Sequence, residues 1–239
     1  MTDETPGQLP TALVTGTSRG LGKAIATDFA KDHRVVGVAR GNWEDEKPGH
    51  VEHLAGVDLA DMKQLEALAP RLAECDILIN NAAIAYDGIL ATQGAENIKQ
   101  LLDVNLYSVI YLSKLFVRER LAVRKPGVVI TIGSIVANRG YRGLAVYSAT
   151  KGALTSLTQS MAREMGSKGF RFNVVQPGFI ETEMSHGLDA KQLEQIVRRT
   201  PLGRLGQADD VVPMVRFLAS SAARFITGHE FVVDGGLTA

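Results

Sequence analysis

Cysteine, aromatic residues and an excess of charge of either sign are all scarce in this chain of 239 residues. Its single cysteine, Cys75, excludes an internal disulfide and favours a reducing, cytoplasmic location. Cys75 precedes an apolar strand without an activating neighbour in the sequence, which predicts a buried structural thiol rather than a nucleophile. The 26 basic and 26 acidic residues give a formal net charge of zero. That balance provides no general attraction to nucleic acid or to an anionic membrane.

Long apolar runs and clustered metal ligands are also missing. No run approaches the roughly 20 apolar residues that a membrane-spanning helix needs. The first ten residues, MTDETPGQLP, are polar and acidic, so they do not resemble a secretory signal, and we interpret 1–10 as a flexible leader. The histidines are scattered rather than grouped with cysteine or aspartate, so no metal site is predicted. They are His33, His50, His53, His186 and His229.

What the chain does contain is a repeated alternation of short apolar strands and helical patterns. Such an alternation indicates a parallel sheet covered by helices on both faces. We therefore predict one doubly wound, Rossmann-type α/β domain over 1–239, with about seven strands. The strands are expected near 11–15, 34–39, 53–57, 76–79, 128–132, 172–175 and 230–233. The helices are expected near 21–31, 61–73, 96–123, 147–165 and 208–220.

One segment, 183–206, is the least regular part of the sequence. We interpret it as a loop or short helices over the carboxyl edge of the sheet. A substrate loop lies there in folds of this type.

A glycine-rich turn, TGTSRGLG at 15–22, separates the first strand from the first helix. Glycines at this point allow a tight turn and a close approach of the backbone to a pyrophosphate, which then faces the positive end of the helix dipole. The turn therefore predicts a dinucleotide site. Its predicted cofactor-binding residues are Gly16, Thr17, Ser18, Arg19, Gly20, Leu21 and Gly22.

The end of the second strand indicates which dinucleotide is bound. An NAD site usually has an acid there for the ribose 2′-hydroxyl, but this chain has Arg40, and no carboxylate follows until Glu44. Arg19 in the phosphate loop is expected to approach the same place. Two guanidinium groups would repel each other unless an anion lay between them, and a 2′-phosphate is such an anion. We therefore predict NADPH rather than NADH.

A catalytic group is predicted at the start of the helix near 147–165. Tyr147 and Lys151 are four residues apart and share a helix face, and Ser134 ends the preceding strand. Because a free tyrosine has a pKa near 10, a proton donor of this type needs a nearby cation, and Lys151 is expected to lower the pKa of Tyr147 by stabilising the phenolate. Ser134 is expected to hold the substrate oxygen. The group predicts reduction of a carbonyl to an alcohol.

The order of these motifs resembles the short-chain dehydrogenase/reductase family over essentially the whole chain. This resemblance implies that Asn105 joins a proton relay through a helix-bound water to Lys151, which would also contact the nicotinamide ribose. It implies further cofactor contacts at Asp58, Leu59, Asn81, Ala82, Pro177, Gly178, Ile180 and Thr182. The matching residues are 15–22, Asn80, Asn81, Ala82, Asn105, Ser134, Tyr147, Lys151, Pro177 and Gly178.

Two positions depart from the usual family pattern. Ala83 stands where the family often has glycine, and we expect its methyl group to be tolerated. Gln176, before Pro177, is less usual and is a candidate substrate contact. Aromatic side chains are candidates for the mouth of the pocket, namely Tyr86, Tyr141 and Phe179.

Within that family the chain resembles most the enzymes that reduce a 3-oxoacyl group on acyl carrier protein, in fatty-acid or polyketide synthesis. This resemblance implies a homotetramer, and an acidic carrier protein as partner. Lys125 and Lys168 are the candidate docking cations, although a solvated helix end is an equally good interpretation of them. The helix around 101–116 is too apolar for an exposed helix, which supports burial on more than one side.

Two other functions stay open. The same residues would serve an NADP-dependent dehydrogenase or reductase of another secondary alcohol, sugar or ketone, and only a panel of substrates separates it from the first hypothesis. A non-catalytic nucleotide-binding sensor is the remote alternative. A binding module has no need of a Tyr–Lys pair, which weighs against the sensor.

Overall fold

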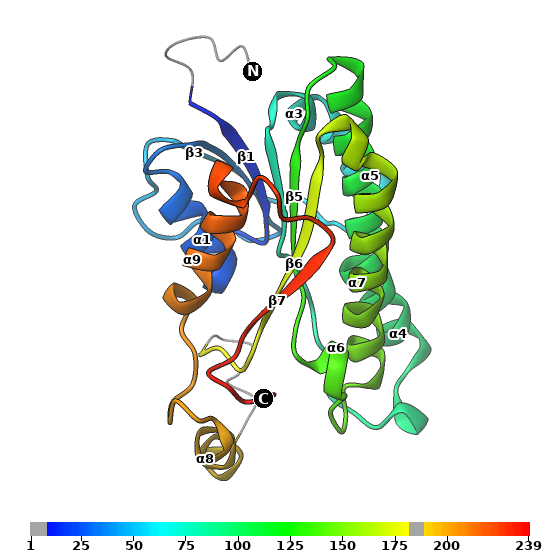
Figure 1. Cartoon of the computed structure of the whole chain (residues 1–239). Coiled ribbons are helices and arrows are strands. Elements are labelled where there is room, and N and C mark those ends of the chain that lie inside the picture. Colours follow the sequence, from blue (N-terminus) through cyan, green and yellow to red (C-terminus); the bar gives the residue numbers. More distant parts are fainter. Residues whose placement is uncertain (1–8, 182–188) are drawn as a thin grey trace.

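The computed structural model describes residues 9–181 and 189–239, and in them it contains a parallel sheet of seven strands. The strand order is β3-β2-β1-β4-β5-β6-β7, so the chain reverses its direction of winding between β3 and β4 (Figure 1). The prediction of a doubly wound α/β fold is confirmed. The strands are β1 Thr11–Thr15, β2 Arg34–Val38, β3 Val51–Leu54, β4 Ile77–Asn80, β5 Val128–Ile132, β6 Arg171–Pro177 and β7 His229–Val233.

Helices cover both faces of the sheet (Figure 1). Two of them, α1 and α9, lie on one face, while α3, α5 and α7 lie on the other. None of the helices in the described ranges is long and apolar enough to cross a bilayer. The helices are α1 Gly20–Phe29, α2 Met62–Ala67, α3 Ala69–Glu74, α4 Ala95–Leu102, α5 Ser108–Ala122, α6 Val136–Arg139, α7 Ala145–Met165, α8 Ala190–Arg199 and α9 Ala208–Ala219.

Side chains that alternate along the strands build two separate cores. In β1, Ala12 and Val14 face α1 and α9, whereas Leu13 faces the layer of α3 and α5. This alternation is the period of two that a strand imposes on its side chains. Because every residue of β1 is buried, its centre, Ala12 to Val14, is continuously apolar rather than alternating with polar residues. The first core includes Ile25, Phe29, Val211, Val215 and Leu218, and the second includes Leu72, Leu78, Leu112, Phe116 and Phe172.

Two of the expected helices are interrupted. The long helix near 96–123 contains a π-helical turn at Asp103–Tyr107, which separates α4 from α5. The helix near 61–73 breaks at Leu68, because Pro70 has no N–H to continue the first helix and instead occupies the first turn of α3. The strand expected at 53–57 lies earlier, at β3. Hydrophobic periodicity cannot show such breaks, since apolar residues continue across them.

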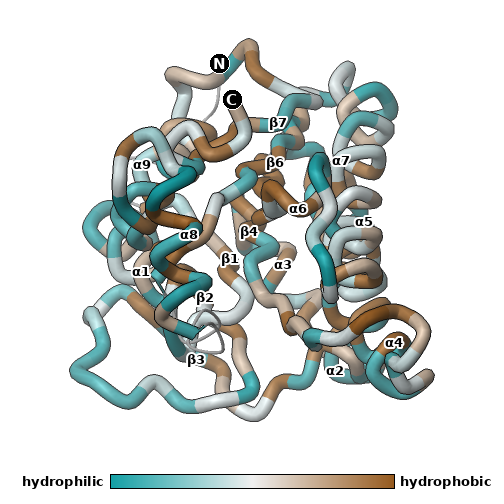
Figure 2. The backbone as a smooth tube through the Cα atoms, turned by 90° about the horizontal axis from the view of Figure 1, so that it is seen from below, coloured by the Kyte–Doolittle hydropathy of each residue, from teal (hydrophilic) through white to brown (hydrophobic). Residues whose placement is uncertain are grey.

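The carboxyl ends of the strands all lie at one edge of the sheet, because the strands are parallel. Figure 2 looks onto this edge and shows α8 lying in front of the strand ends. Part of the segment expected as a substrate loop is therefore helical, at α8. In an open α/β sheet, ligands bind at this edge, beside the point where the strand order reverses.

Candidate active site

The phosphate loop connects β1 to α1 at the carboxyl edge, where the sequence places it. Gly16 has a φ of +78°, a left-handed conformation that glycine adopts without strain. A Cβ atom on Gly22 would lie 2.2 Å from the carbonyl oxygen of Gly16, so only glycine fits there. The loop is therefore held close to its own helix, with little side-chain bulk between its backbone and a ligand.

The first turn of α1 suits an anion. It contains no acidic residue, and the side chain of Arg19 at the N-cap does not cap the helix. The first N–H groups of α1 thus have no side-chain cap, and the positive end of the helix dipole faces the edge where a ligand binds. This donor set fits the pyrophosphate of a dinucleotide.

The segment that follows β2 lies beside the phosphate loop. Arg19 and Arg40 are both exposed. A Cβ atom on Gly41 would lie 3.4 Å from Cβ of Ser18, so the turn after Arg40 adjoins the loop. The structure thus brings together the two segments that the sequence selects for a 2′-phosphate.

The residues that we predict to contact the adenosine follow β3 and β4, at the same edge of the sheet. Asn81 is fixed by Thr15, whose Oγ1 accepts hydrogen bonds from the backbone N–H groups of Asn81 and Ala82, each at 3.0 Å. The side chain of Asp58 caps its own turn by accepting from the N–H of Ala60 at 3.0 Å. Leu59 is buried in the second core, so its backbone rather than its side chain can face a ligand.

The predicted catalytic residues converge from two elements. Ser134 follows β5, and α7 carries Tyr147 and Lys151 one turn apart. Tyr147 shares a side-chain hydrogen bond with Ser134. The ammonium of Lys151 donates to the carbonyl oxygen of Ile132 at 2.8 Å and lies 5.7 Å from the centre of the Tyr147 ring. The structure thus brings these three side chains together.

The direction of the pKa shift at Tyr147 differs from the prediction. Burial raises the pKa of Tyr147 to about 12, and the hydrogen bond with Ser134 lowers it only in part. Burial also lowers the pKa of Lys151 to about 8. The net shift of the Tyr147 pKa is therefore opposite to the lowering that we expected beside Lys151, because removal from water disfavours the charged forms of both groups. At neutral pH Tyr147 therefore holds its proton.

Asn105 lies in the π-helical turn and is fully buried. Its side chain accepts from the N–H of Ile84 at 2.9 Å and donates to the carbonyl oxygen of Ile84 at 2.8 Å. Within the described residues the amide of Asn105 therefore binds the segment after β4 and not Lys151. A relay to Lys151 would have to use the backbone of this turn, and π-helical turns occur frequently at functional sites.

The remaining predicted cofactor contacts lie at the end of β6, at Pro177, and just after it. A Cβ atom on Gly178 would lie 2.7 Å from Cβ of Asp234, so this position requires glycine. Asp234 is itself fixed by the backbone N–H groups of Gly236 and Thr238, at 2.8 Å each. Ile180 pairs with Gly206 in an isolated β-bridge. Thr182 lies outside the described residues.

Gln176 does not contact substrate as predicted, because its side chain is fully buried. Its amide accepts from Asn138 Nδ2 at 2.9 Å and donates to Glu230. These contacts join α6, which follows Ser134, to β6 and β7. Sequence reasoning missed this network, since its three members are far apart along the chain. The aromatic candidates lie in different places. The ring centroids of Tyr141 and Phe179 are 5.5 Å apart, in edge contact, whereas the Tyr86 hydroxyl binds Gln100.

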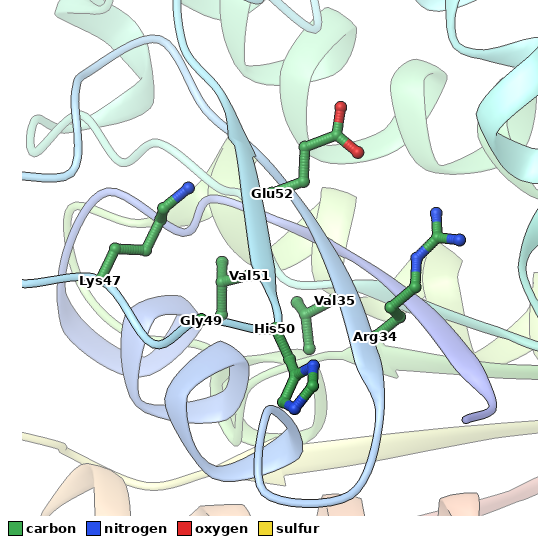
Figure 3. Close-up of a pocket in the computed structure, with 7 residues that line it drawn as sticks. All are labelled: Arg34, Val35, Lys47, Gly49, His50, Val51 and Glu52. Carbon is green, nitrogen blue, oxygen red and sulfur yellow. The ribbon is translucent and has the colours of Figure 1, made fainter. Parts of the chain in front are cut away.

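A shallow hollow lies at the other edge of the sheet, between the starts of β2 and β3 (Figure 3). Arg34, Lys47 and His50 line it, but His50 points away from the other two. Because it is at the amino ends of the strands, it is separate from Ser134 and Tyr147. These three side chains do not converge, so they make no site of their own.

Comparisons with known proteins identify the family of the chain. A family model described as enoyl-(acyl carrier protein) reductase matches residues 16–238. The 3-oxoacyl-[acyl-carrier-protein] reductase FabG of Escherichia coli (strain K12) is 39% identical over 95% of this chain and 96% of its own length. The reductase FabG of Vibrio cholerae is 36% identical over 95% and 96% of the two chains.

Solved structures share the fold closely. A protein assigned as an NAD(P)-dependent gluconate 5-dehydrogenase from Beutenbergia cavernae, with bound NADP, has a TM-score of 0.91 and 32% identity, covering 97% of each chain. A protein assigned as a 2-deoxy-D-gluconate 3-dehydrogenase from Agrobacterium tumefaciens, also with NADP, has a TM-score of 0.90 and 32% identity, covering 98% and 99%. With its phosphate loop, its Ser134–Tyr147–Lys151 group and these relatives, the chain belongs to the short-chain dehydrogenase/reductase family.

Proposed function

We propose that the protein uses NADPH to reduce a 3-oxoacyl thioester, carried on acyl carrier protein, to the 3-hydroxyacyl form, in fatty-acid or polyketide synthesis. The observation that carries the proposal is the convergence of Ser134, Tyr147 and Lys151 at the carboxyl edge, beside the open phosphate loop. The substrate class rests on the reductases of that name that match almost the whole chain at 35–39% identity.

Each catalytic side chain has a role in this reaction. Ser134 donates a hydrogen bond to the carbonyl oxygen of the substrate and so orients it. Tyr147 gives its phenolic proton to the same oxygen, and its raised pKa keeps that proton in place at neutral pH. The ammonium of Lys151 offsets the negative charge that then develops on the phenol oxygen. When bound, NADPH supplies the hydride.

The apolar side of α8 supports an acyl substrate. Leu193, Ile196 and Val197 lie on one side of this helix and remain only partly covered at the carboxyl edge. An acyl chain can bury such a surface, whereas a polyol would leave it exposed to water.

The experiment that tests the substrate is NADPH oxidation with acetoacetyl thioesters of coenzyme A and of acyl carrier protein. We expect turnover with both and a lower KM for the carrier-bound form. A crotonyl thioester tests the enoyl reduction that the family model's description names, and we expect no turnover with it. No turnover with either acetoacetyl thioester, in a protein that binds NADPH, would refute the proposed substrate.

A second candidate is an NADP-dependent dehydrogenase of a sugar acid or another secondary alcohol. It is favoured by the solved structures with NADP, which are assigned as gluconate dehydrogenases. Gluconate and 2-deoxygluconate with NADP, in the same assay run in the opposite direction, separate it from the first. Turnover with these polyols and none with the thioesters would establish the second candidate.

Arg40 is proposed to select NADPH by binding the 2′-phosphate together with Arg19. We expect Arg40→Asp to raise the Kd for NADPH by about 10- to 100-fold, since a charge-assisted hydrogen bond is lost and a repulsion gained. The Kd for NADH should fall, because an acid here suits a 2′-hydroxyl. Fluorescence titration measures both. Arg34→Asp, at the other end of β2, is the control and should change neither value.

Lys125 and Lys168 lie in segments that come together, since a Cβ atom on Gly169 would lie 3.1 Å from Cβ of Pro126. Both lysines are exposed and precede β5 and β6, at the edge opposite Tyr147. We therefore propose that a carrier protein bound there serves the site of a neighbouring subunit. Lys125→Glu with Lys168→Glu should raise KM for the carrier-bound substrate about tenfold. The coenzyme A thioester is the control, and an equal effect on both substrates would refute docking.

A homotetramer is proposed because α5 and the π-helical turn before it leave apolar side chains uncovered. Tyr107 is 46% exposed and Ile110 is 40% exposed, although Val109 and Leu112 on the other side are buried. Phe225, before β7, is fully exposed and marks a second uncovered surface. Apolar surfaces of this kind are usually buried in an interface.

A further inference from the structure

The ring of His53 connects the two halves of the proposed 2′-phosphate site. Its Nδ1 lies 3.0 Å from Thr17 Oγ1 in the phosphate loop, and its Nε2 lies 2.9 Å from the carbonyl oxygen of Gly41, next to Arg40. One ring thus contacts both segments at once. His53 is therefore placed to control the spacing between them.

These contacts settle which ring nitrogen carries the proton. A carbonyl oxygen can only accept, so Nε2–H donates to Gly41, while Nδ1 contacts the Thr17 hydroxyl, which can donate or accept. Both ring nitrogens are thereby paired. The Thr17 side chain is held inward, fully buried, which leaves the backbone of the loop to face a phosphate.

The sheet makes room for this connection at Gly37. Gly37 pairs with His53 between β2 and β3, and a Cβ atom on Gly37 would lie 2.6 Å from Thr17 Oγ1. The hydroxyl of Thr17 therefore occupies the space that a side chain on β2 would fill. A loop residue packs into the sheet here, and His53 is the partner that receives it.

The turn after β2 is fixed on two sides. The carbonyl oxygen of Arg40 accepts from the N–H of Gly56 at 3.1 Å, and the next carbonyl, of Gly41, accepts from His53. Trp43 packs its ring against His53 at 5.8 Å, in edge contact, and the ammonium of Lys23 lies over the Trp43 ring at 5.4 Å. The backbone that carries the Arg40 side chain is thus held in one orientation.

We propose that His53 is a positioning residue that sets the preference for NADPH over NADH, by tying the Thr17 hydroxyl to the Gly41 carbonyl and so aligning the phosphate loop with Arg40. The inference rests on the proposed cofactor. His53 acts through its neighbours and does not touch the dinucleotide.

The test measures the Kd values of NADPH and NADH through the fluorescence of Trp43, the only tryptophan in the chain. We expect His53→Leu to raise the Kd for NADPH about five- to tenfold, as the loss of two hydrogen bonds implies. The Kd for NADH should change less than about twofold. His53→Gln, whose amide can still donate to Gly41, should restore most of the preference.

Two further variants separate positioning from a general loss of structure. In an Arg40→Ala background His53→Leu should have little additional effect on the NADPH to NADH ratio, because it acts through Arg40. His50→Leu, in the hollow of Figure 3, is the matched control and should leave the ratio unchanged. If His53→Leu does not fold, Thr17→Val removes the same connection from the loop side and should lower the ratio in the same way.

If His53→Leu weakens the binding of NADPH and NADH equally, the inference is overturned. An undiminished effect of His53→Leu on the NADPH to NADH ratio in the Arg40→Ala background would also overturn it. A wild-type chain that binds NADH as tightly as NADPH would overturn the proposed cofactor first, and this inference with it. A wild-type preference for NADPH that survives His53→Leu and Thr17→Val would overturn this inference alone.

Discussion

Replacing Tyr147 with phenylalanine is expected to lower kcat by about 10²- to 10⁴-fold, the usual contribution of a positioned proton donor. The change removes only the phenol oxygen, which shares a hydrogen bond with Ser134 and holds its proton because burial raises the pKa of Tyr147 to about 12. The ring remains, so the Kd for NADPH should change less than about twofold. Stopped-flow NADPH oxidation and fluorescence titration measure the two quantities.

Tyr111→Phe is the matched control for this prediction. Tyr111 is also a helical tyrosine, and its hydroxyl donates to Glu66 at 2.9 Å on the surface of α5, far from Ser134 along the chain. It should leave kcat unchanged. If Tyr147→Phe keeps its activity, Tyr147 is not the proton donor. A wild-type protein that binds NADPH but turns over no substrate in a broad panel would instead favour the nucleotide sensor.

Replacing Lys151 with methionine should remove activity and yet stabilise the fold. Lys151 is almost completely buried, and burial lowers its pKa from 10.5 to about 8. Below pH 8 the lysine is charged in the folded and the unfolded chain, so the folded state carries the full cost of the buried charge. That cost corresponds to about 3 kcal/mol. Lys151→Met should therefore raise the free energy of unfolding at pH 7, by less than this amount because the hydrogen bond to the carbonyl oxygen of Ile132 is lost.

The same pKa shift predicts how the difference between the two proteins changes with pH. Between about pH 8 and 10.5 the folded wild type has lost this proton while the unfolded chain still binds it, so wild-type stability rises with pH. The advantage of Lys151→Met should shrink over that window. Tyr147 is present in both proteins, so its own titration cancels in the comparison.

Urea denaturation of both proteins at pH 7, 8.5 and 9.5 measures this change. Lys168→Met, at an exposed lysine beyond the end of α7, is the control and should show no such trend. Stability curves of wild type and Lys151→Met that run parallel from pH 7 to 9.5 would contradict the prediction. The activity of Lys151→Met at pH 7 is expected to fall at least about 10²-fold. Because the variant is folded at that pH, the loss of activity is then not due to unfolding.

Local patterns were sufficient to predict most of the strands and to place the candidate catalytic residues on their elements. The run from Ala12 to Val14 is continuously apolar because both faces of β1 are buried, and the glycines that follow the strand are required by close backbone contacts, as at Gly22. Tyr147 and Lys151 share a face because a helix has 3.6 residues per turn. Parallel strands end at one edge, which brings the loops after β1, β2, β4, β5 and β6 together.

Long-range contacts account for what the local patterns did not predict. The side chain of Asn105, in the π-helical turn, makes two hydrogen bonds with Ile84, 21 residues away, and periodicity does not record them. Gln176 is a packing and hydrogen-bonding residue because Asn138 and Glu230, from other elements, meet its amide. In the sequence His53 is one of several scattered histidines. Its contact with Thr17 depends on the fold, because Gly37 has no side chain and leaves room for the Thr17 hydroxyl.

The fold class, the phosphate loop and the Ser–Tyr–Lys group follow from the amino-acid order alone, because they depend on local periodicity, on glycine conformation and on the succession of elements. The charge states and the connections between elements follow only from the packed molecule. Burial raises the pKa of Tyr147 and lowers that of Lys151, and the first shift is opposite to what a tyrosine beside a lysine in water would show. The depth at which a side chain lies depends on every layer around it, and so does its pKa.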